Sequence, residues 1–127
     1  MSRVAGPLAL LLLLAIAAVA VGCSTSPPTW AGHPPEEDGW LYADGRCGKV
    51  FVDADARRLA LTRAARVIAD RLGLDVERRL SVTASEGKLF VEALGPDGPL
   101  HDLDALELVD EAECDGTAYV LVRLRRP

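Results

Sequence analysis

The sequence predicts an α+β fold in which one long helix packs on a small, mostly antiparallel sheet. Two observations predict it: a single helical period spans residues 53–72, and short runs of alternating apolar and polar residues lie on both sides of it. The order of one strand, one helix and then several strands places the helix over one face of the sheet. With 127 residues, half of them hydrophobic, the chain has the size of one domain.

Residues 1–22 have the layout of a secretory signal peptide. Arg3 supplies a positive charge, and an unbroken apolar run of fourteen residues extends from Leu8 to Val21. A membrane-spanning helix needs about 20 apolar residues, and the polar residues 24–28 follow too soon for that. We therefore expect this segment to be removed on export, with an uncleaved anchor as the alternative.

Small residues precede Cys23, and the stretch from Ala20 to Cys23 resembles a bacterial lipobox. The resemblance implies that the Cys23 thiol is diacylated, the leader is cut and the new amino terminus is acylated. The lipobox pattern prefers Leu where this chain has Ala20, and the alternative is a conventional cleavage site near an ordinary cysteine. Each buried methylene contributes about 0.8 kcal/mol, so several chains would hold the protein firmly. Ser24 resembles the residue typical of outer-membrane sorting, so we expect a lipid anchor on the periplasmic face of that membrane.

Residues 23–39 are predicted to form the acylated cysteine and a flexible, disordered tether. Residues 24–39 contain four prolines, two serines and an acidic triplet, and they show no hydrophobic period. The one large apolar side chain, Trp30, is expected to dock locally or rest near lipid headgroups. Residues 40–127 are then the folded domain.

The domain is predicted to begin with a strand at Trp40–Ala43 and a turn at Asp44–Gly45. The helix follows, with Asp53 or Asp55 as its cap and Gly73 at its end. One apolar stripe of this helix is expected to pack on the sheet, and it consists of Leu61, Ala64, Ala65, Ile68 and Leu72.

The second half of the chain is predicted to consist mainly of strands. Residues 80–85 and 88–94 alternate around Glu86–Gly87 and predict a hairpin, and residues 95–99 predict a loop. In residues 103–113 we expect a short turn and then a strand. Asp115–Gly116 predicts a hairpin corner that leads into the last strand at residues 117–124.

The chain has three cysteines. Acylation of Cys23 would leave Cys47 and Cys114 as a candidate disulfide in an oxidising compartment, worth about 4 kcal/mol in the chain-entropy model. Two inert thiols are the alternative. No CxxC or His-Cys spacing indicates zinc or redox chemistry.

Several stretches resemble the LPP20-like lipoproteins, a bacterial envelope family. They are Cys23, residues 28–30, residues 39–45, the helix from Ala56 to Ile68, and residues 116–122. The resemblance implies an α+β envelope domain with no established chemistry and no catalytic residues to carry over. Relatives with similar folds serve the assembly of flagellar or peptidoglycan machinery.

The residues that enzymes use are scarce. His33 lies in the predicted tether and His101 in a predicted loop. His101 to Asp104 is expected to be surface rather than a metal site, and residues 44–49 lack the spacing of a phosphate-binding loop. We therefore expect no cofactor, no metal and no enzyme activity, with a hydrolytic site around His101 as the alternative.

Charge is distributed unevenly along the domain. Residues 46–88 contain ten basic and six acidic side chains, whereas residues 89–122 contain nine acidic and no basic ones. We call these two segments the basic pole and the acidic pole. They either complement each other across the fold or face other molecules. The net charge of −5 and the export signal make nucleic acid an unfavourable binding partner. We expect a non-catalytic module that binds an envelope protein, through the Arg63 and Arg66 face or the sheet edge near the acidic hairpin. A passive envelope constituent is the alternative.

Overall fold

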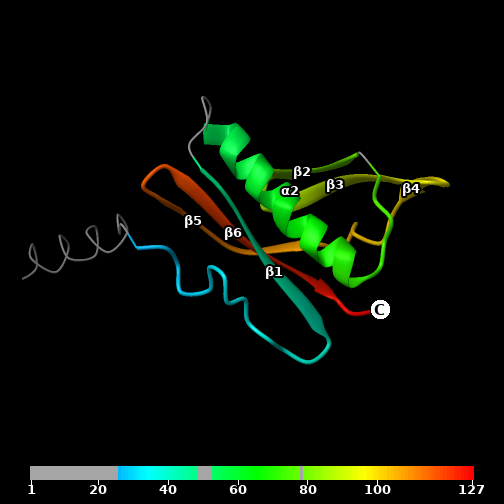
Figure 1. Cartoon of the computed structure of the whole chain (residues 1–127), viewed down its shortest axis with the longest axis horizontal. Coiled ribbons are helices and arrows are strands. Elements are labelled where there is room, and N and C mark those ends of the chain that lie inside the picture. The colour runs from blue at the N-terminus through cyan, green and yellow to red at the C-terminus, as the bar shows by residue number, and fades with distance from the viewer. Residues whose placement is uncertain (1–25, 49–52, 78) are drawn as a thin grey trace, which may run out of the picture.

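The computed structural model describes residues 26–48, 53–77 and 79–127. It confirms the α+β fold: one helix packs against two small antiparallel sheets (Figure 1). The elements in chain order are β1 (Trp40–Cys47), α2 (Asp53–Arg71), β2 (Leu80–Ser85), β3 (Lys88–Gly95), β4 (Gly98–Leu100), β5 (Glu107–Cys114) and β6 (Thr117–Arg125). The predicted signal peptide and Cys23 lie outside the described residues. Among those described, no helix is long and apolar enough to cross a membrane.

Helix α2 ends as its sequence predicts. Gly73 adopts a left-handed φ of 72°, and the amide of Leu74 donates to the carbonyl of Ala69 at 3.0 Å. The predicted cap at Asp53 lies outside the described side chains, and Asp55 accepts a hydrogen bond from Arg58 instead. The apolar stripe is buried as expected. The buried helix residues are Ala56, Ala60, Leu61, Ala64, Ala65, Ile68 and Ala69, with Leu72 partly buried beside them.

The predicted turn at Asp44–Gly45 is wrong, because β1 continues through both residues to Cys47. Gly45 is there because α2 passes directly over the strand. A Cβ atom on Gly45 would overlap the carbonyl oxygen of Ala60 and lie 2.8 Å from the amide nitrogen of Ala64. This glycine therefore allows close contact between helix and sheet rather than a reversal of the chain.

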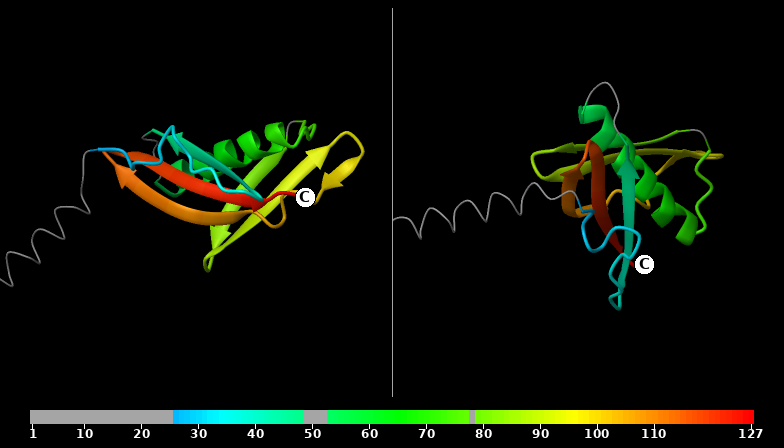
Figure 2. Two further views of the ribbon diagram at one scale, coloured as in Figure 1. Left: turned by 90° about the horizontal axis from the view of Figure 1, so that it is seen from below. Right: turned by 60° about the vertical axis from the view of Figure 1, so that its left-hand side comes forward.

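The strands form two sheets instead of the single sheet predicted. Sheet A has the order β1-β6-β5 and sheet B the order β2-β3-β4, and every pairing is antiparallel. The predicted hairpins at Glu86–Gly87 and Asp115–Gly116 both form, whereas the predicted loop at 95–99 is a tight turn into β4. Figure 2 shows the strands of the two sheets running at a steep angle to each other. The shared core contains Leu61, Ile68, Val82, Leu103, Val120 and Val122.

Residues 26–39 differ from the predicted tether, because they lie against the face of sheet A opposite α2 (Figures 1 and 2). We call this segment the strap. Its Trp30 indole donates to Asp110 in β5 at 3.0 Å, and the amide of Gly32 donates to Asp44 in β1 at 2.8 Å. On this face Leu121 is only 2% exposed. The strap is thus a layer of the fold, held by side chains of both edge strands.

Candidate interaction site

A β-bulge in β5 decides which way its acidic side chains point. The pairing of β5 with β6 shifts register between Leu108 and Asp110, so Val109 is an extra residue. Because successive strand residues point to opposite faces, an inserted residue exchanges the faces of all that follow. Asp110 therefore faces the strap, where it accepts the hydrogen bond from the indole, whereas Glu111 and Glu113 face the side of α2.

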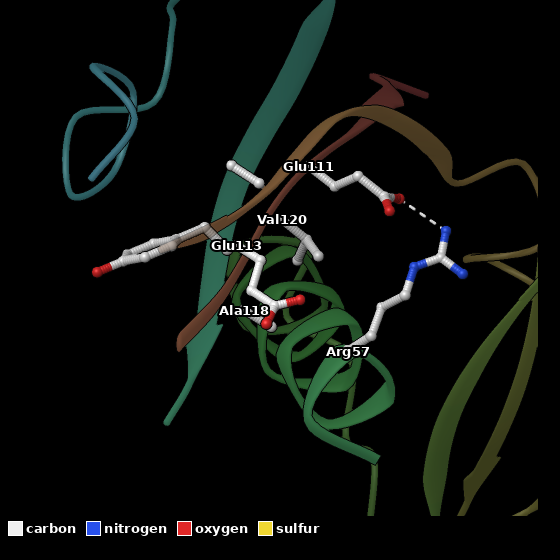
Figure 3. A pocket seen from close by; sticks show the side chains of 7 residues that line it. Arg57, Glu111, Glu113, Ala118 and Val120 are labelled. Atoms are coloured by element: carbon white, nitrogen blue, oxygen red, sulfur yellow. Dashed lines mark hydrogen bonds and ion pairs between the residues drawn. The ribbon is translucent and has the colours of Figure 1, made fainter. Parts of the chain in front are cut away.

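An open groove of about 400 Å³ lies between α2 and the hairpin of β5 and β6 (Figure 3). It exists because α2 packs on β1, β2 and β6 rather than on β5. Leu108 at the start of β5 packs on the core, but the helix-side face of β5 is left uncovered from Glu111 onward, and Glu111 and Glu113 extend from it into the groove. Ala118 and Val120 of β6 line the groove beneath them.

As far as the structure describes the chain, the groove contains one ion pair and one carboxylate without a partner. Arg57 of α2 donates from Nη2 to Glu111 at 2.6 Å, and their side chains are 41% and 44% exposed. This pair joins the basic and acidic poles that the sequence shows. The Nε atom of Arg57 is buried without an acceptor. Within the described part of the chain, Glu113 makes no hydrogen bond or ion pair, so the groove presents a free negative charge beside an open strand edge.

The other end of sheet A carries a different arrangement. The guanidinium of Arg123 lies 4.0 Å from the centre of the Trp40 ring, and it donates to Glu107 at 3.0 Å and to the Tyr42 hydroxyl at 3.4 Å. The hydrogen bonds to Tyr42 and Glu107 raise the pKa of Arg123 above its usual value. Tyr42 in turn donates to Glu37 of the strap at 2.7 Å. These side chains satisfy one another, and they attach the strap to the start of β1.

The predicted Arg63 and Arg66 surface lies on the outer side of α2, and the two side chains differ. Arg63 donates to the carbonyl oxygen of Arg46 at 2.8 Å, so it holds the end of β1. Arg66 is exposed and makes no hydrogen bond or ion pair with any described residue. Leu59 and Val67 on the same side are each 39% exposed. The surface is therefore mixed: both arginines are exposed, but Arg63 is held by a backbone contact and Arg66 is not.

The predicted disulfide between Cys47 and Cys114 does not form, and both cysteines are free. Their positions in sheet A explain this. Cys47 pairs with Ala118 on the helix side, whereas Cys114 pairs with Thr117 on the strap side, with β6 between the two strands. Cys114 donates from Sγ to the carbonyl oxygen of Ser26 at 3.2 Å. Their spacing in sequence does not show that the pleat directs them to opposite faces.

The alternative enzymatic site around His101 is a small surface turn. His101 Nδ1 lies 2.9 Å from a carboxylate oxygen of Asp104, and the two side chains are 78% and 54% exposed. Among the described residues, Asp104 is the one side chain hydrogen-bonded to His101, and no hydroxyl or thiol is bonded to it. The described residues also contain no cluster of three potential metal ligands.

The acidic hairpin is visible in the sequence, whereas the bulge and the groove are not. Leu108 and Val109 are adjacent apolar residues followed by the adjacent acids Asp110 and Glu111, a pattern that breaks the alternation without showing which residue is the extra one. Comparison with known proteins found no match among family models, curated proteins or solved structures. The LPP20-like resemblance therefore stays a prediction.

Proposed function

We propose that this protein is an acylated bacterial envelope lipoprotein whose domain is a non-catalytic module for binding another envelope protein. The anchor is supported by the lipobox-like residues Ala20 to Cys23, which follow a short apolar leader. The bound segment of the partner is an extended peptide carrying positive charge. It adds a strand to the free edge of β5.

The open edge of β5 carries this proposal. β5 is the last strand of sheet A, so one side of its backbone pairs with no strand of the described residues. A peptide that pairs with such an edge directs alternate side chains to the two faces of the sheet. Those on the helix side would enter the groove beside Glu113, where a lysine or arginine meets the free carboxylate. The bulge at Val109 and the charges along β5 also limit pairing between copies of this chain.

The intact mass of the native product tests the anchor. We expect a chain that begins at Cys23 and carries acyl groups, and a Cys23→Ala variant that loses membrane retention or keeps its leader. A native product that begins at another residue, or that carries no lipid, would contradict the anchor.

Photo-crosslinking in the native envelope tests the binding edge. A crosslinking amino acid at Val109, which is 43% exposed, should form an adduct with a protein. Glu113→Lys should reduce its yield at least about tenfold, since like charges replace an attractive pair at a loss of about 1.4 kcal/mol or more. Glu92→Lys, an exposed acid of β3, is the matched control and should leave the yield unchanged. Adducts with lipid alone, or equal effects of the two lysines, would overturn the proposed edge.

A further inference from the structure

The strap begins at one corner of sheet A and ends at the opposite corner. Its first described residue, Ser26, accepts the hydrogen bond from Cys114 at the end of β5, next to the turn into β6. Its last part reaches the start of β1, where the amide of Trp40 donates to the carbonyl of Glu37 at 3.1 Å. Ser26 and the turn of β5 and β6 thus lie at one end of the sheet. The C-terminus lies toward the other end (Figure 1).

The length of chain before the strap limits where the domain can be. Ser26 is only three residues after Cys23, and at about 3.6 Å per residue this stretch spans at most about 11 Å. A free tether over residues 23–39 would have a mean end-to-end distance of about 22 Å and would allow every orientation. The contacts of the strap reduce that freedom, because they hold residues 26–39 on the domain itself and leave three residues between Cys23 and Ser26.

We propose that the strap fixes the orientation of the domain on the membrane. The corner formed by Cys114 to Thr117 faces the lipid headgroups, and the end of sheet A with Trp40 and Arg125 faces away. The proposal rests on the proposed acylation of Cys23. The nine residues of β6 separate the two ends of sheet A by about 27 to 30 Å. The two ends therefore differ greatly in their distance from the lipid headgroups.

This orientation also places the proposed binding groove. Glu113 pairs with Ala118, one residue from the corner, so the groove lies at the end of the sheet that faces the headgroups. A segment that enters it must come close to the bilayer surface. The partner is therefore a membrane protein that offers a basic stretch just outside its membrane-embedded part.

Paramagnetic broadening of amide signals measures the orientation without changing the domain. The acylated protein is placed in nanodiscs that contain a small fraction of lipid with a headgroup-chelated gadolinium ion. The broadening falls with the sixth power of distance, so we expect it to be at least about tenfold stronger at Gly116 than at Leu124, which lie some 27 Å apart along β6. A flexible Gly-Ser insert between Thr25 and Ser26 should abolish this difference, and it should also reduce the crosslinking yield at Val109.

The outcomes separate the inference from the proposed function. Equal broadening at both ends of β6 in acylated protein would overturn the orientation and leave the anchor standing. A difference that persists with the insert would show that another contact orients the domain, and would also overturn the role of the strap. A Cys23→Ser variant should show no broadening at all. If the native protein also shows none, both the anchor and the orientation are wrong.

Discussion

Sheets A and B each have three strands, but they are covered differently. Sheet A has α2 on one face and the strap on the other, and Leu121 and Tyr42 on the strap side are only 2% and 7% exposed. Among the described residues nothing covers one face of sheet B, and on this open face Phe90 and Leu94 are 56% and 38% exposed. The difference shows that a segment without helical or strand periodicity can cover a sheet when a few polar contacts hold it in place.

The largest effect should come from separating α2 from sheet A. Gly45→Ala places a methyl group against the backbone of α2, so we expect a loss of about 3 kcal/mol or more in the free energy of unfolding. Urea denaturation measures it. Gly48→Ala is the control, because no atom of the described residues, its chain neighbours apart, lies within 4 Å of the place that its new methyl group would take, and it should change stability by less than about 0.5 kcal/mol. Equal midpoints for the two variants would refute the close contact.

The strap-covered face of sheet A and the open face of sheet B can be compared directly by truncation. Leu121→Ala removes a side chain buried under the strap and should cost about 2 to 4 kcal/mol. Phe90→Ala removes a larger but exposed side chain of sheet B, and it should cost less than about 1 kcal/mol. Thermal or urea unfolding gives both values. A cost for Phe90→Ala as large as that for Leu121→Ala would mean that the faces do not differ as described.

A smaller effect should follow from loosening the strap at one point. Trp30→Phe keeps an aromatic ring but removes the hydrogen bond to Asp110, and it should cost about 1 kcal/mol. Asp110→Asn retains an acceptor at this position and should cost less. The urea midpoint is the measurement. No loss of stability in Trp30→Phe would argue that the indole does not hold the strap.

The smallest effect concerns the ion pair of the groove. Arg57 and Glu111 are both about two-fifths exposed, so their coupling in a double-mutant cycle should be below about 1 kcal/mol and should weaken in concentrated salt. Arg58 and Asp55, an exposed pair within α2, are the control and should give a similar or lower value. A coupling of several kcal/mol, insensitive to salt, would show that the groove is closed to solvent.

The sequence predicted those parts of the fold that depend on local pattern. The stripe containing Leu61 and Ile68 identified α2, and the alternation around Glu86–Gly87 identified the hairpin of β2 and β3. The turn predicted at Asp44–Gly45 is wrong because Asp-Gly is typical of turns. The actual role of Gly45 depends on how closely α2 approaches β1. The distance between helix and strand is a property of the packed fold, and no pattern in the neighbouring sequence indicates it.

The strap and the site depend on contacts between distant residues. Prolines and acids in residues 26–39 predict a tether, and only the positions of Asp44 and Asp110 on sheet A show where the segment docks. Similarly, the acids of β5 are visible in the sequence, but the bulge at Val109 decides which of them enter the groove. The free thiols of Cys47 and Cys114 follow from the same register.

Backbone ¹⁵N relaxation of the domain tests most directly whether the strap is part of the fold. We predict order parameters of about 0.85 for residues 28–38, equal to those of β1, because the strap is bonded to Asp110, Asp44 and Tyr42. Values below about 0.6 across the same residues would show a mobile tether. They would contradict both the second layer over sheet A and the fixed orientation that we infer from it.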